Sequence, residues 1–564
     1  MGIYKMRLTS SLEKPMTSDT INKFPPLKRV SVLKGERLSF QVLLTNIDEC
    51  LTWRGVAGKV SFSGELSKYA SVRDLAYVPI AHPTLQHDKA WWLDDNYVSK
   101  NPGIFPDFLR PLHSGGRVFI PNSLLTALWV EVNVPKKIKA GEYTLTVTVN
   151  VDDEDDCNKI SLSETLTLEL INAALPDDEI YYTNWFHCDC LASYYNVKMW
   201  SRRHWEIVEN FMRVAKKNGI NMIYTPLLTP PLNTAVGGER PTTQLVGVTL
   251  DNGKYSFDFT LLDKWVKLCD KVGFKYFEIN HLFTQWGASH APKVMATVDG
   301  EKRRIFGWET DSHGEEYVRF LREMLGAFIS HMKKSGNDKR CFFHISDEPR
   351  AGQIESYRKA KESISDILEG YVVMDALSHL DFYLDGSCDN PIPANNRIAP
   401  FIEAKVKNLW TYSSCTQATG VSNRFIAMPG WRNRSIGFQM YKYGIVGFLH
   451  WGYNFYFNQH SKNLINPYVQ GDGDLWIEPG DAFSVYPDMD GTALESTRII
   501  TFFEALQDMK AMKLCEKYYG KEIIVKIIDE AIGCDVTFHD CATSAAQIFE
   551  IREKINLLIK KAVK

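Results

Sequence analysis

The sequence carries almost no surplus of charge of one sign. Its 564 residues include 65 basic and 68 acidic side chains, for a net charge of −3 with neutral histidines. Proteins that bind nucleic acids or anionic membranes usually concentrate lysine and arginine on one surface. The balance of charge therefore argues against nucleic-acid partners and favours small, uncharged ligands.

Long hydrophobic runs are also missing. No stretch approaches the roughly 20 consecutive apolar residues that a membrane-spanning helix needs. The first residues show no apolar segment suited to a signal peptide. We therefore expect no membrane partner and a cytoplasmic location.

The cysteines form no recognisable framework. There are 11 of them, an odd number, scattered from Cys50 to Cys541, and only Cys188 and Cys190 lie close together in sequence. A lone C-x-C pair is a poor signature of a zinc or redox site. The sequence also has no glycine-rich phosphate loop after its first predicted barrel strand. We therefore expect structural or idle thiols, no metal and no cofactor.

The composition, 45% hydrophobic and 12% aromatic, is typical of a well-packed protein of two or three domains. Residues 1–175 read as short strands, and the segments 38–44, 128–134 and 141–149 alternate apolar and polar side chains. Such alternation gives each strand one face in a core and one in water, which predicts an antiparallel β-sandwich. The acidic run 152–156 lacks the spacing of a calcium loop and predicts a solvated hairpin tip.

After Pro176 the pattern changes to apolar strands that alternate with amphipathic helices, such as 315–334, each ending at a glycine. This predicts a (β/α)8 barrel of the TIM type over residues 176–515, and an open doubly wound sheet remains the alternative. A C-terminal extension, 516–564, reads as a short strand and a helix. The predicted barrel strands are 181–187, 221–227, 275–283, 341–348, 371–377, 396–402, 408–415 and 445–452.

Polar and aromatic side chains gather at the carboxyl ends of these strands, where barrel enzymes place their chemistry. Sugar rings have apolar faces that stack on Trp and Tyr, and hydroxyls that need Asn, His or carboxylate partners. The strand ends therefore predict a carbohydrate substrate. The predicted binding residues are Trp185, His187, Tyr224, Asn280, His281, Trp286, Tyr412, Trp451, Tyr453 and Asn454.

The sharpest signal is the sequence Asp347-Glu348-Pro349 at the end of the fourth strand. Neighbouring side chains on a strand normally point to opposite faces. At the last residue of a strand the pleat can break, and we expect Pro349 to hold Glu348 extended so that both carboxylates enter one pocket. Closely spaced carboxylates push their pKa values apart, which suits general acid and base catalysis.

From about Thr183 to Asp508 the chain resembles glycoside hydrolase family 123 and the wider, largely uncharacterised group of proteins that share its catalytic domain. An N-terminal β-sandwich before a barrel also matches the layout of the family. The segments that carry the resemblance are Asn184-Trp185-Phe186-His187-Cys188-Asp189, His344-Ile345-Ser346-Asp347-Glu348-Pro349, Asn423-Arg424-Phe425, Gly447-Phe448-Leu449-His450-Trp451-Gly452-Tyr453-Asn454, Tyr486-Pro487, Ser496-Thr497-Arg498 and Leu506-Gln507-Asp508.

The resemblance implies a retaining, exo-acting β-N-acetylgalactosaminidase that works by substrate-assisted catalysis. In that mechanism the 2-acetamido oxygen of the substrate attacks the anomeric carbon and forms an oxazoline. Matched by motif, Asp347 orients the acetamido N–H. Glu348 protonates the leaving oxygen and then acts as base on water.

Three alternatives stay open. The first is a glycosidase of the same fold with another sugar specificity, because the galactose and glucose configurations differ at one hydroxyl. The second is a non-catalytic carbohydrate-binding protein, against which the retention of Asp347 and Glu348 argues. The third is a metal-dependent barrel hydrolase with the ligands His187, Asp189, His281 and His450. The sequence does not decide whether the chain forms a homo-oligomer.

Overall fold

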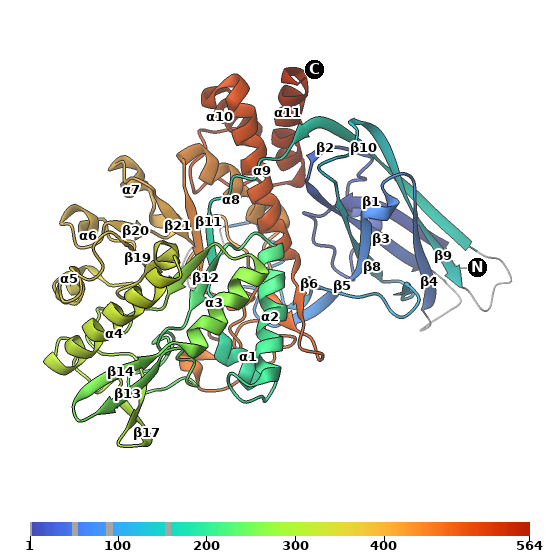
Figure 1. Ribbon diagram of the computed structural model, residues 1–564. Helices are drawn as coiled ribbons and strands as arrows, with labels where there is room; N and C mark the ends of the chain where they lie inside the picture. The colour runs from blue at the N-terminus through green and yellow to red at the C-terminus, as the bar shows by residue number, and fades with distance from the viewer. Residues whose placement is uncertain (1–2, 48–54, 86–93, 153–159, 564) are drawn as a thin grey trace.

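The computed structural model describes residues 3–47, 55–85, 94–152 and 160–563 (Figure 1). The chain forms an N-terminal region of β-sheets beside a larger barrel (Figure 1). The acidic run for which we predict a hairpin tip lies, beyond Asp152, outside the described residues.

Two five-stranded sheets make up the N-terminal region. The first has the order β1 (Ile3–Ser10), β3 (Arg37–Ile47), β8 (Leu125–Asn133), β5 (Ala70–Ile80), β6 (Gly103–Arg110). The second has the order β2 (Arg29–Lys34), β10 (Ile160–Ala174), β9 (Gly141–Asp152), β4 (Val56–Ser63), β7 (Arg117–Ile120). The predicted strands in this region are confirmed by β3, β8 and β9. Pairing is antiparallel as expected, except that β2 and β10 run parallel, which their long connection allows.

The central strands β3 and β8 of the first sheet are buried on both faces, which corrects the expectation that each strand shows one face to water. Phe40 packs in the core between the two sheets, whereas Leu43 and Trp129 belong to the core shared with the barrel. Gln41, which the alternation assigns to water, is buried and donates hydrogen bonds to the Ser10 and Glu13 carbonyls at 2.9 and 2.8 Å. Internal partners here replace the water that the alternating pattern predicts.

Eight parallel strands form the barrel. The Tyr412 N–H donates to the Pro393 carbonyl at 3.1 Å, and a bridge from Ala394 to Tyr412 brings the two end strands together, so the barrel is nearly closed. The predicted parallel barrel is confirmed, with strands only three to five residues long. The strand order is β20 (Asn390–Ile392), β19 (Val372–Ala376), β18 (Cys341–Phe343), β15 (Tyr276–Ile279), β12 (Met222–Thr225), β11 (Tyr181–Asn184), β22 (Gly447–His450), β21 (Trp410–Tyr412).

Helices alternate with the barrel strands, and the predicted helix at 315–334 is α4. The helices are α1 (Cys188–Tyr194), α2 (Arg202–Lys217), α3 (Thr260–Val272), α4 (Glu315–Lys334), α5 (Ile354–Glu362), α6 (Asp381–Leu384), α7 (Ala399–Glu403) and α8 (Gly430–Tyr443). Glycines predicted to end helices have left-handed backbones, with φ of 98° at Gly273 and 68° at Gly444.

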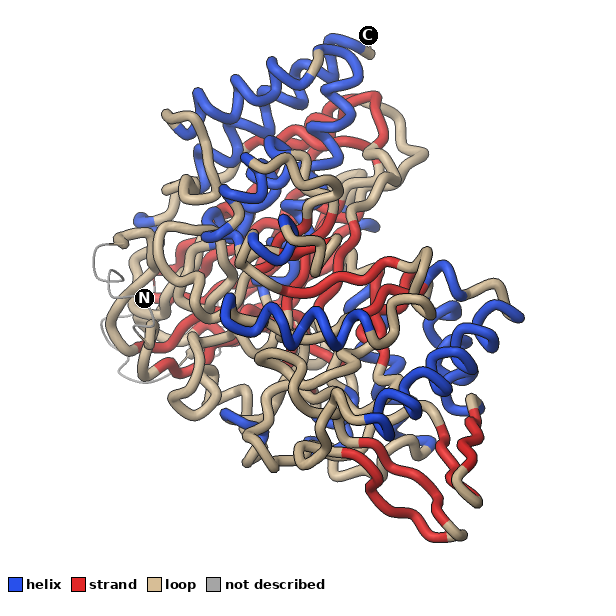
Figure 2. The backbone as a smooth tube through the Cα atoms, turned by 90° about the vertical axis from the view of Figure 1, so that its left-hand side faces the viewer, coloured by secondary structure: helices blue, strands red, loops and turns tan. Residues whose placement is uncertain are grey.

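Two hairpins are inserted into the barrel sequence after β12 and β15. They are β13 (Gly247–Asp251) with β14 (Lys254–Asp258), and β16 (Val294–Val298) with β17 (Glu301–Phe306). Together they form a four-stranded sheet that projects from the edge of the molecule (Figure 1, Figure 2). A further short pair, β23 (Val485–Pro487) and β24 (Ala493–Glu495), precedes the C-terminal helices.

The sixth barrel strand lies earlier than predicted. Residues 396–402 belong to a 3-10 turn and to α7, whose first turn contains Pro400; proline favours this position because the first helical N–H groups have no partner. The strand is instead β20, which contains Pro391 and is followed by Pro393. Proline has no N–H group to donate to a neighbouring strand, so a segment with two prolines is not predicted as a strand.

The C-terminal tail is helical, which corrects the expectation of a short strand within 516–564. It follows α9 (Thr497–Tyr519) and contains α10 (Lys521–Ile532) and α11 (Ala545–Ala562). The apolar run that suggests a strand lies on α10, where Ile524 and Ile528 are buried at helical spacing. Because α11 contacts β2, β10 and α9, the tail bridges the N-terminal sheets and the barrel (Figure 1).

The nine described cysteines are free. Cys188 and Cys190 lie buried at the start of α1, and burial raises the pKa of both thiols above the ordinary range. Both therefore stay neutral. In the described part of the chain, no helix is long and apolar enough to cross a membrane.

Candidate active site

A cavity of about 260 Å³ opens at the carboxyl ends of the barrel strands. Side chains that follow β11, β18 and β22 converge on it, together with Tyr412 at the end of β21. Its lining includes Trp185, His187, Leu232, Asn233, Arg240, Gln285, Trp286, Asp347, Glu348, Tyr412, Ser414, Trp451, Phe455, His460 and Trp476. The position agrees with the prediction that the chemistry lies at this end of the barrel.

Asp347 and Glu348 both line this cavity, although the backbone differs from the one expected. Glu348 has a φ of 44°, so it is left-handed rather than extended before Pro349. The Trp286 N–H donates to the Asp347 carbonyl at 3.1 Å, and the Glu348 N–H donates to the Ala376 carbonyl at 3.0 Å. These bonds hold the turn after β18 against its neighbours, and the left-handed residue brings two adjacent side chains to one side.

The two carboxyl groups have different surroundings. The Tyr412 hydroxyl donates to Glu348 Oε1 at 2.6 Å, whereas Asp347 receives no hydrogen bond from any described side chain or amide. Burial and then the charge of Glu348 raise the pKa of Asp347 well above its ordinary value, and the charge of His344 opposes this rise. The two carboxyl groups therefore lie in different environments, and burial favours the neutral form of Asp347.

A row of buried charges supports the pair inside the barrel. His344 Nε2 lies 2.8 Å from Glu278 Oε1, and His344 Nδ1 lies 3.0 Å from Asp375 Oδ1. Trp185 Nε1 donates to Glu278 at 2.8 Å, and the Tyr357 hydroxyl donates to Asp375 at 2.6 Å. Glu278 thereby fixes the indole ring of Trp185 in the cavity wall.

His344 is an imidazolium at neutral pH. Burial alone would lower its pKa, but hydrogen bonds to Asp375 and Glu278 outweigh burial and raise the pKa of His344 to about 10. Ligand atoms of His281, His344 and Asp375 lie within 4.8 Å of one another, a spacing that could hold a metal ion. A metal needs a free ring nitrogen, and both nitrogens of His344 donate to carboxylates, so this cluster fits an ion-paired support.

His187 and Asp189 share the buried Arg240. Arg240 donates to both Asp189 oxygens at 2.7 Å and to His187 Nδ1 at 3.2 Å. Burial, and then the charge of Arg240, lowers the pKa of His187 to about 3. The ring is therefore neutral, and its Nε2 lies 2.9 Å from the Trp451 carbonyl as a donor.

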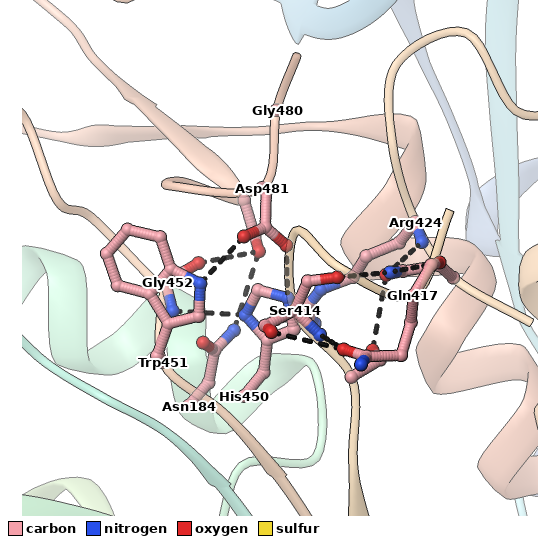
Figure 3. Close-up of polar contacts among 12 residues, drawn as sticks. Asn184, Ser414, Gln417, Arg424, His450, Trp451, Gly452, Gly480 and Asp481 are labelled. Atoms are coloured by element: carbon pink, nitrogen blue, oxygen red, sulfur yellow. Dashed lines mark hydrogen bonds and ion pairs between the residues drawn. The ribbon is translucent and has the colours of Figure 1, made fainter. Parts of the chain in front are cut away.

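Asp481 fixes the indole ring of Trp451 by a hydrogen bond (Figure 3). Trp451 Nε1 donates to Asp481 Oδ2 at 2.7 Å, and His450 Nε2 lies 3.2 Å from Asp481 Oδ1. The Gly452 N–H donates to His450 Nδ1 at 3.0 Å, which leaves Nε2 to carry the proton. Burial raises the pKa of Asp481 to about 7, against the lowering effect of the Trp451 bond.

The four ligands of the alternative metal-dependent hydrolase do not converge. His187 and Asp189 are hydrogen-bonded to the Arg240 guanidinium, and His450 is hydrogen-bonded to the Asp481 carboxylate. His281 Nδ1 lies 2.9 Å from the Tyr224 hydroxyl. Among the residues that the structure describes, these four form no group with metal-ligand spacing. Their geometry therefore does not favour that alternative.

The ten predicted binding residues divide into two groups. Trp185, His187, Trp286, Tyr412 and Trp451 line the cavity. The other five do not line the cavity; they are buried and bind protein groups, and their contact with substrate stays a prediction. These five are Tyr224, Asn280, His281, Tyr453 and Asn454. The Tyr224 hydroxyl is hydrogen-bonded to His281, and the Tyr453 hydroxyl donates to the Phe211 carbonyl. The side-chain oxygens of Asn280 and Asn454 accept from the N–H groups of Leu228 and His187.

Sequence reasoning missed lining residues that come from long loops, among them Arg240, Gln285, His460 and Trp476. These loops have no periodicity, so nothing in them marks which side chain turns inward. Glu278 could have been found, because it is a lone charge inside an apolar strand and such a charge needs a buried partner.

Comparisons with known proteins agree with this geometry. The model of the glycoside hydrolase 123 catalytic domain matches residues 185–515. A family 123 glycoside hydrolase from Clostridium perfringens, studied for glycolipid glycan hydrolysis, has a similar structure, with a TM-score of 0.72 and 15% identity over 99% of this chain and 97% of that chain. This likeness shows a shared fold over nearly the whole length of both proteins.

More distant matches include a β-glucuronidase from Bifidobacterium dentium, with a TM-score of 0.30 and 9% identity over 90% of this chain and 67% of that one. A glycosyl hydrolase family 2 member from Bacteroides cellulosilyticus has a TM-score of 0.26 and 11% identity over 87% and 53% of the two chains. These scores are too low to carry an argument. No curated protein matches the chain.

Proposed function

Because the chain belongs to glycoside hydrolase family 123, we propose that it removes a terminal β-linked N-acetylhexosamine, foremost N-acetylgalactosamine, by substrate-assisted catalysis. Family membership makes the chain a glycosidase, and the sugar and the mechanism are the proposal. The natural substrate would be the glycan of a glycolipid, by analogy with the similar Clostridium enzyme.

One observation carries the proposal: Asp347 and Glu348 are the only carboxylates among the described residues that line the cavity, and they are adjacent in sequence. A conventional glycosidase places two carboxylates on opposite sides of the scissile bond. A pair on one turn leaves the opposite side without an enzymic nucleophile. The 2-acetamido oxygen of the substrate can supply it.

The two roles are those that the resemblance to the family implies. The acetamido oxygen bonds to the anomeric carbon while the glycosidic C–O bond breaks, and Glu348 gives its proton to the leaving oxygen. Asp347, free of protein donors, accepts the acetamido N–H and balances the developing positive charge. In the second step Glu348 takes a proton from water, the water oxygen bonds to the anomeric carbon, and the oxazoline ring opens.

Aromatic rings in the lining suit one sugar ring. Trp185, Trp451 and Trp476 offer apolar faces, and Glu278 and Asp481 hold the first two indoles by their N–H groups. Rings fixed in this way are a preorganised binding surface, so little ordering is left to do when a sugar binds.

We also propose a domain division of 1–175, 176–515 and 516–564, with the two N-terminal sheets forming a β-sandwich. The core cluster shared by β3, β8, β9 and β10 supports this description.

The test is a panel of 4-nitrophenyl β-glycosides of N-acetylgalactosamine, N-acetylglucosamine, galactose and glucose. We expect turnover of the 2-acetamido sugars alone, with the galactose configuration preferred, and competitive inhibition by an N-acetylhexosamine thiazoline. Hydrolysis of the galactoside at a rate comparable with that of the 2-acetamido sugars would contradict substrate-assisted catalysis. Binding of the thiazoline with no turnover of any glycoside would indicate a carbohydrate-binding protein.

A further inference from the structure

A second, larger cavity of about 770 Å³ adjoins the first. Trp286, Glu348 and Tyr412 line both cavities, so the Glu348 carboxyl lies at their boundary. In the proposed function Glu348 protonates the glycosidic oxygen, which is the atom between the sugar that is removed and the sugar that leaves. If the first cavity holds the N-acetylhexosamine, the second is placed to hold the leaving group.

We call this second cavity the basic groove, because positively charged side chains outnumber carboxylates in its lining. Arg350 and Arg397 line it, and Glu348 is the one carboxylate among its described lining residues. Arg350 follows the catalytic pair directly, and Arg397 lies in the turn after β20. Two arginines from the turns after different barrel strands thus line the cavity on the side where the leaving group would lie.

Neither guanidinium is paired with a described residue of the protein. Within the described residues, Arg350 and Arg397 form no ion pair and no side-chain hydrogen bond. Other exposed arginines of the barrel behave differently: Arg322 binds Asp366 at 2.6 Å and Arg358 binds Asp385 at 2.5 Å. Guanidinium groups bind carboxylate and sulfate oxygens with paired donors, so two free ones in a hollow suit an anion.

The rest of the groove suits a sugar. Gln417 Nε2 donates to Asn396 Oδ1 at 3.2 Å, and Gln417 Oε1 accepts from the Ser414 N–H at 2.8 Å, so both amides are fixed in the wall. Trp286 is 39% exposed, and its backbone carbonyl accepts a hydrogen bond from Gln353 Nε2 at 2.5 Å. The groove therefore offers a ring for stacking, amides for hydroxyls and cations for an acid group.

We propose that the basic groove is a leaving-group subsite for an anionic sugar, one that carries a carboxylate or a sulfate beside the scissile bond. This rests on the proposed function for the position of the bond, and on the unpaired arginines for the charge. The shared ligand chemistry is an oxyanion on a sugar ring, supplied by an acidic sugar or by a sulfate ester.

The experiment compares three disaccharides with the same terminal β-N-acetylhexosamine: one linked to a neutral hexose, one to the matching uronic acid and one to the 6-sulfated hexose. The rate of each, as kcat/KM, is divided by the rate on the 4-nitrophenyl glycoside. We expect the acidic substrates to exceed the neutral one by about tenfold or more, as charged hydrogen bonds of ordinary strength would give. The preference should shrink as ionic strength rises.

Arg350→Gln and Arg397→Gln should each reduce the acidic-to-neutral ratio, and the double variant should bring it close to one. Arg202→Gln is the matched control, because its side chain is 95% exposed on α2, away from both cavities. It should leave the ratio unchanged. The ratio of carboxylate to sulfate substrate tells which source the groove prefers.

Equal rates on the neutral and acidic substrates, unaffected by salt and by both substitutions, would overturn the subsite. Failure of every 2-acetamido aryl glycoside would instead overturn the proposed function. In that case calorimetry with the free uronic acid disaccharide and its neutral counterpart still tests the subsite. Tighter binding of the acidic disaccharide that is lost in the double variant supports the subsite, and equal binding of the two disaccharides contradicts it.

Discussion

Glu348 adopts a backbone conformation that few residues other than glycine use. A left-handed residue of this kind costs on the order of 1–3 kcal/mol, and its φ is 44°. Hydrogen bonds from Trp286 to Asp347 and from Glu348 to Ala376 hold the turn on both sides. The folded barrel thus compensates for the strained turn before any substrate binds, and the two carboxylates are already in place.

Substitution of Glu348 by Gln separates its two proposed roles. The amide cannot donate the acid proton, so kcat/KM on a disaccharide should fall roughly 100-fold or more, as the loss of a general acid predicts. A dinitrophenyl glycoside needs no protonation and should lose far less. Rates are compared on both substrates, with Glu355→Gln as a control on an exposed helix position. Equal losses on both substrates would rule out the acid role.

The pH profile tests Asp347. Burial and the charge of Glu348 raise the pKa of Asp347 well above its ordinary value. In the proposed role Asp347 must be ionised, so kcat/KM falls as the pH drops through this raised pKa.

The same substitution, Glu348→Gln, removes the neighbouring charge, and the acid limb should therefore move to lower pH. The measurement uses the dinitrophenyl glycoside, for which the variant stays active. A limb that stays in place or moves upward would show that another group controls it, and Glu355→Gln should not shift it.

Single residues were predictable where a strand end and a chemical type coincide. Asp347, Glu348, Trp185 and Trp451 follow β18, β11 and β22, and all four line the cavity. Tyr453 could not be told from Trp451 by the same reasoning, because which of two neighbours faces the cavity depends on the turn after the strand. That turn is fixed by distant partners such as Asp481.

At the scale of elements, the barrel strands are short, and polar residues begin soon after each one. β18 ends at Phe343, five residues before Glu348, so loops rather than strands carry most of the cavity wall. The sequence located seven of the eight strands because each is an apolar run before a polar cluster. It missed β20, where Pro391 hides the strand and Pro400 begins a helix.

Close packing of α8 on α9 depends on Gly437. A Cβ at Gly437 would lie 2.5 Å from the Ala505 carbonyl oxygen, so the helices must move apart to accept alanine. We expect Gly437→Ala to lower the free energy of unfolding by about 1–3 kcal/mol, measured by urea denaturation.

The matched control is Gly326→Ala in α4, where a Cβ meets no atom within 4 Å. Removing a helical glycine there should raise the stability by roughly 0.5–1 kcal/mol. If both variants raise the stability, helix propensity outweighs the α8–α9 contact and the predicted clash is wrong.

At the scale of the whole molecule, buried ion pairs join the N-terminal sheets to the barrel. Asp107 of β6 accepts from Arg498 of α9 at 2.7 and 2.9 Å, and from the Tyr486 hydroxyl at 2.6 Å. Lys14 lies 4.0 Å from Asp107, and burial lowers the pKa of Lys14 to about 8. The division into sheets and barrel follows from patterns along the sequence, but a pair 391 positions apart leaves no local trace.

Asp107→Asn should destabilise the whole chain. It leaves the buried Arg498 without its counter-charge, and loss of one partner of such a pair costs about 3–5 kcal/mol. Asp74→Asn is the control, because Asp74 pairs at 2.7 Å with a half-exposed Arg110 on the same sheet and such pairs are worth about 0–1 kcal/mol. Thermal and urea unfolding compare the two. Similar losses would mean that the junction is no more than a surface contact.

The contact of α11 with β2 has a consequence for how the protein is made. Glu36 and Ser31 are buried. Arg552 donates to Glu36 at 2.7 Å. The Ser31 hydroxyl donates to Glu553 at 2.7 Å and accepts from Asn556 at 2.9 Å. These partners are synthesised more than 500 positions later. On the ribosome, Glu36 and Ser31 therefore emerge long before these partners exist, and their contacts form only once α11 has been translated.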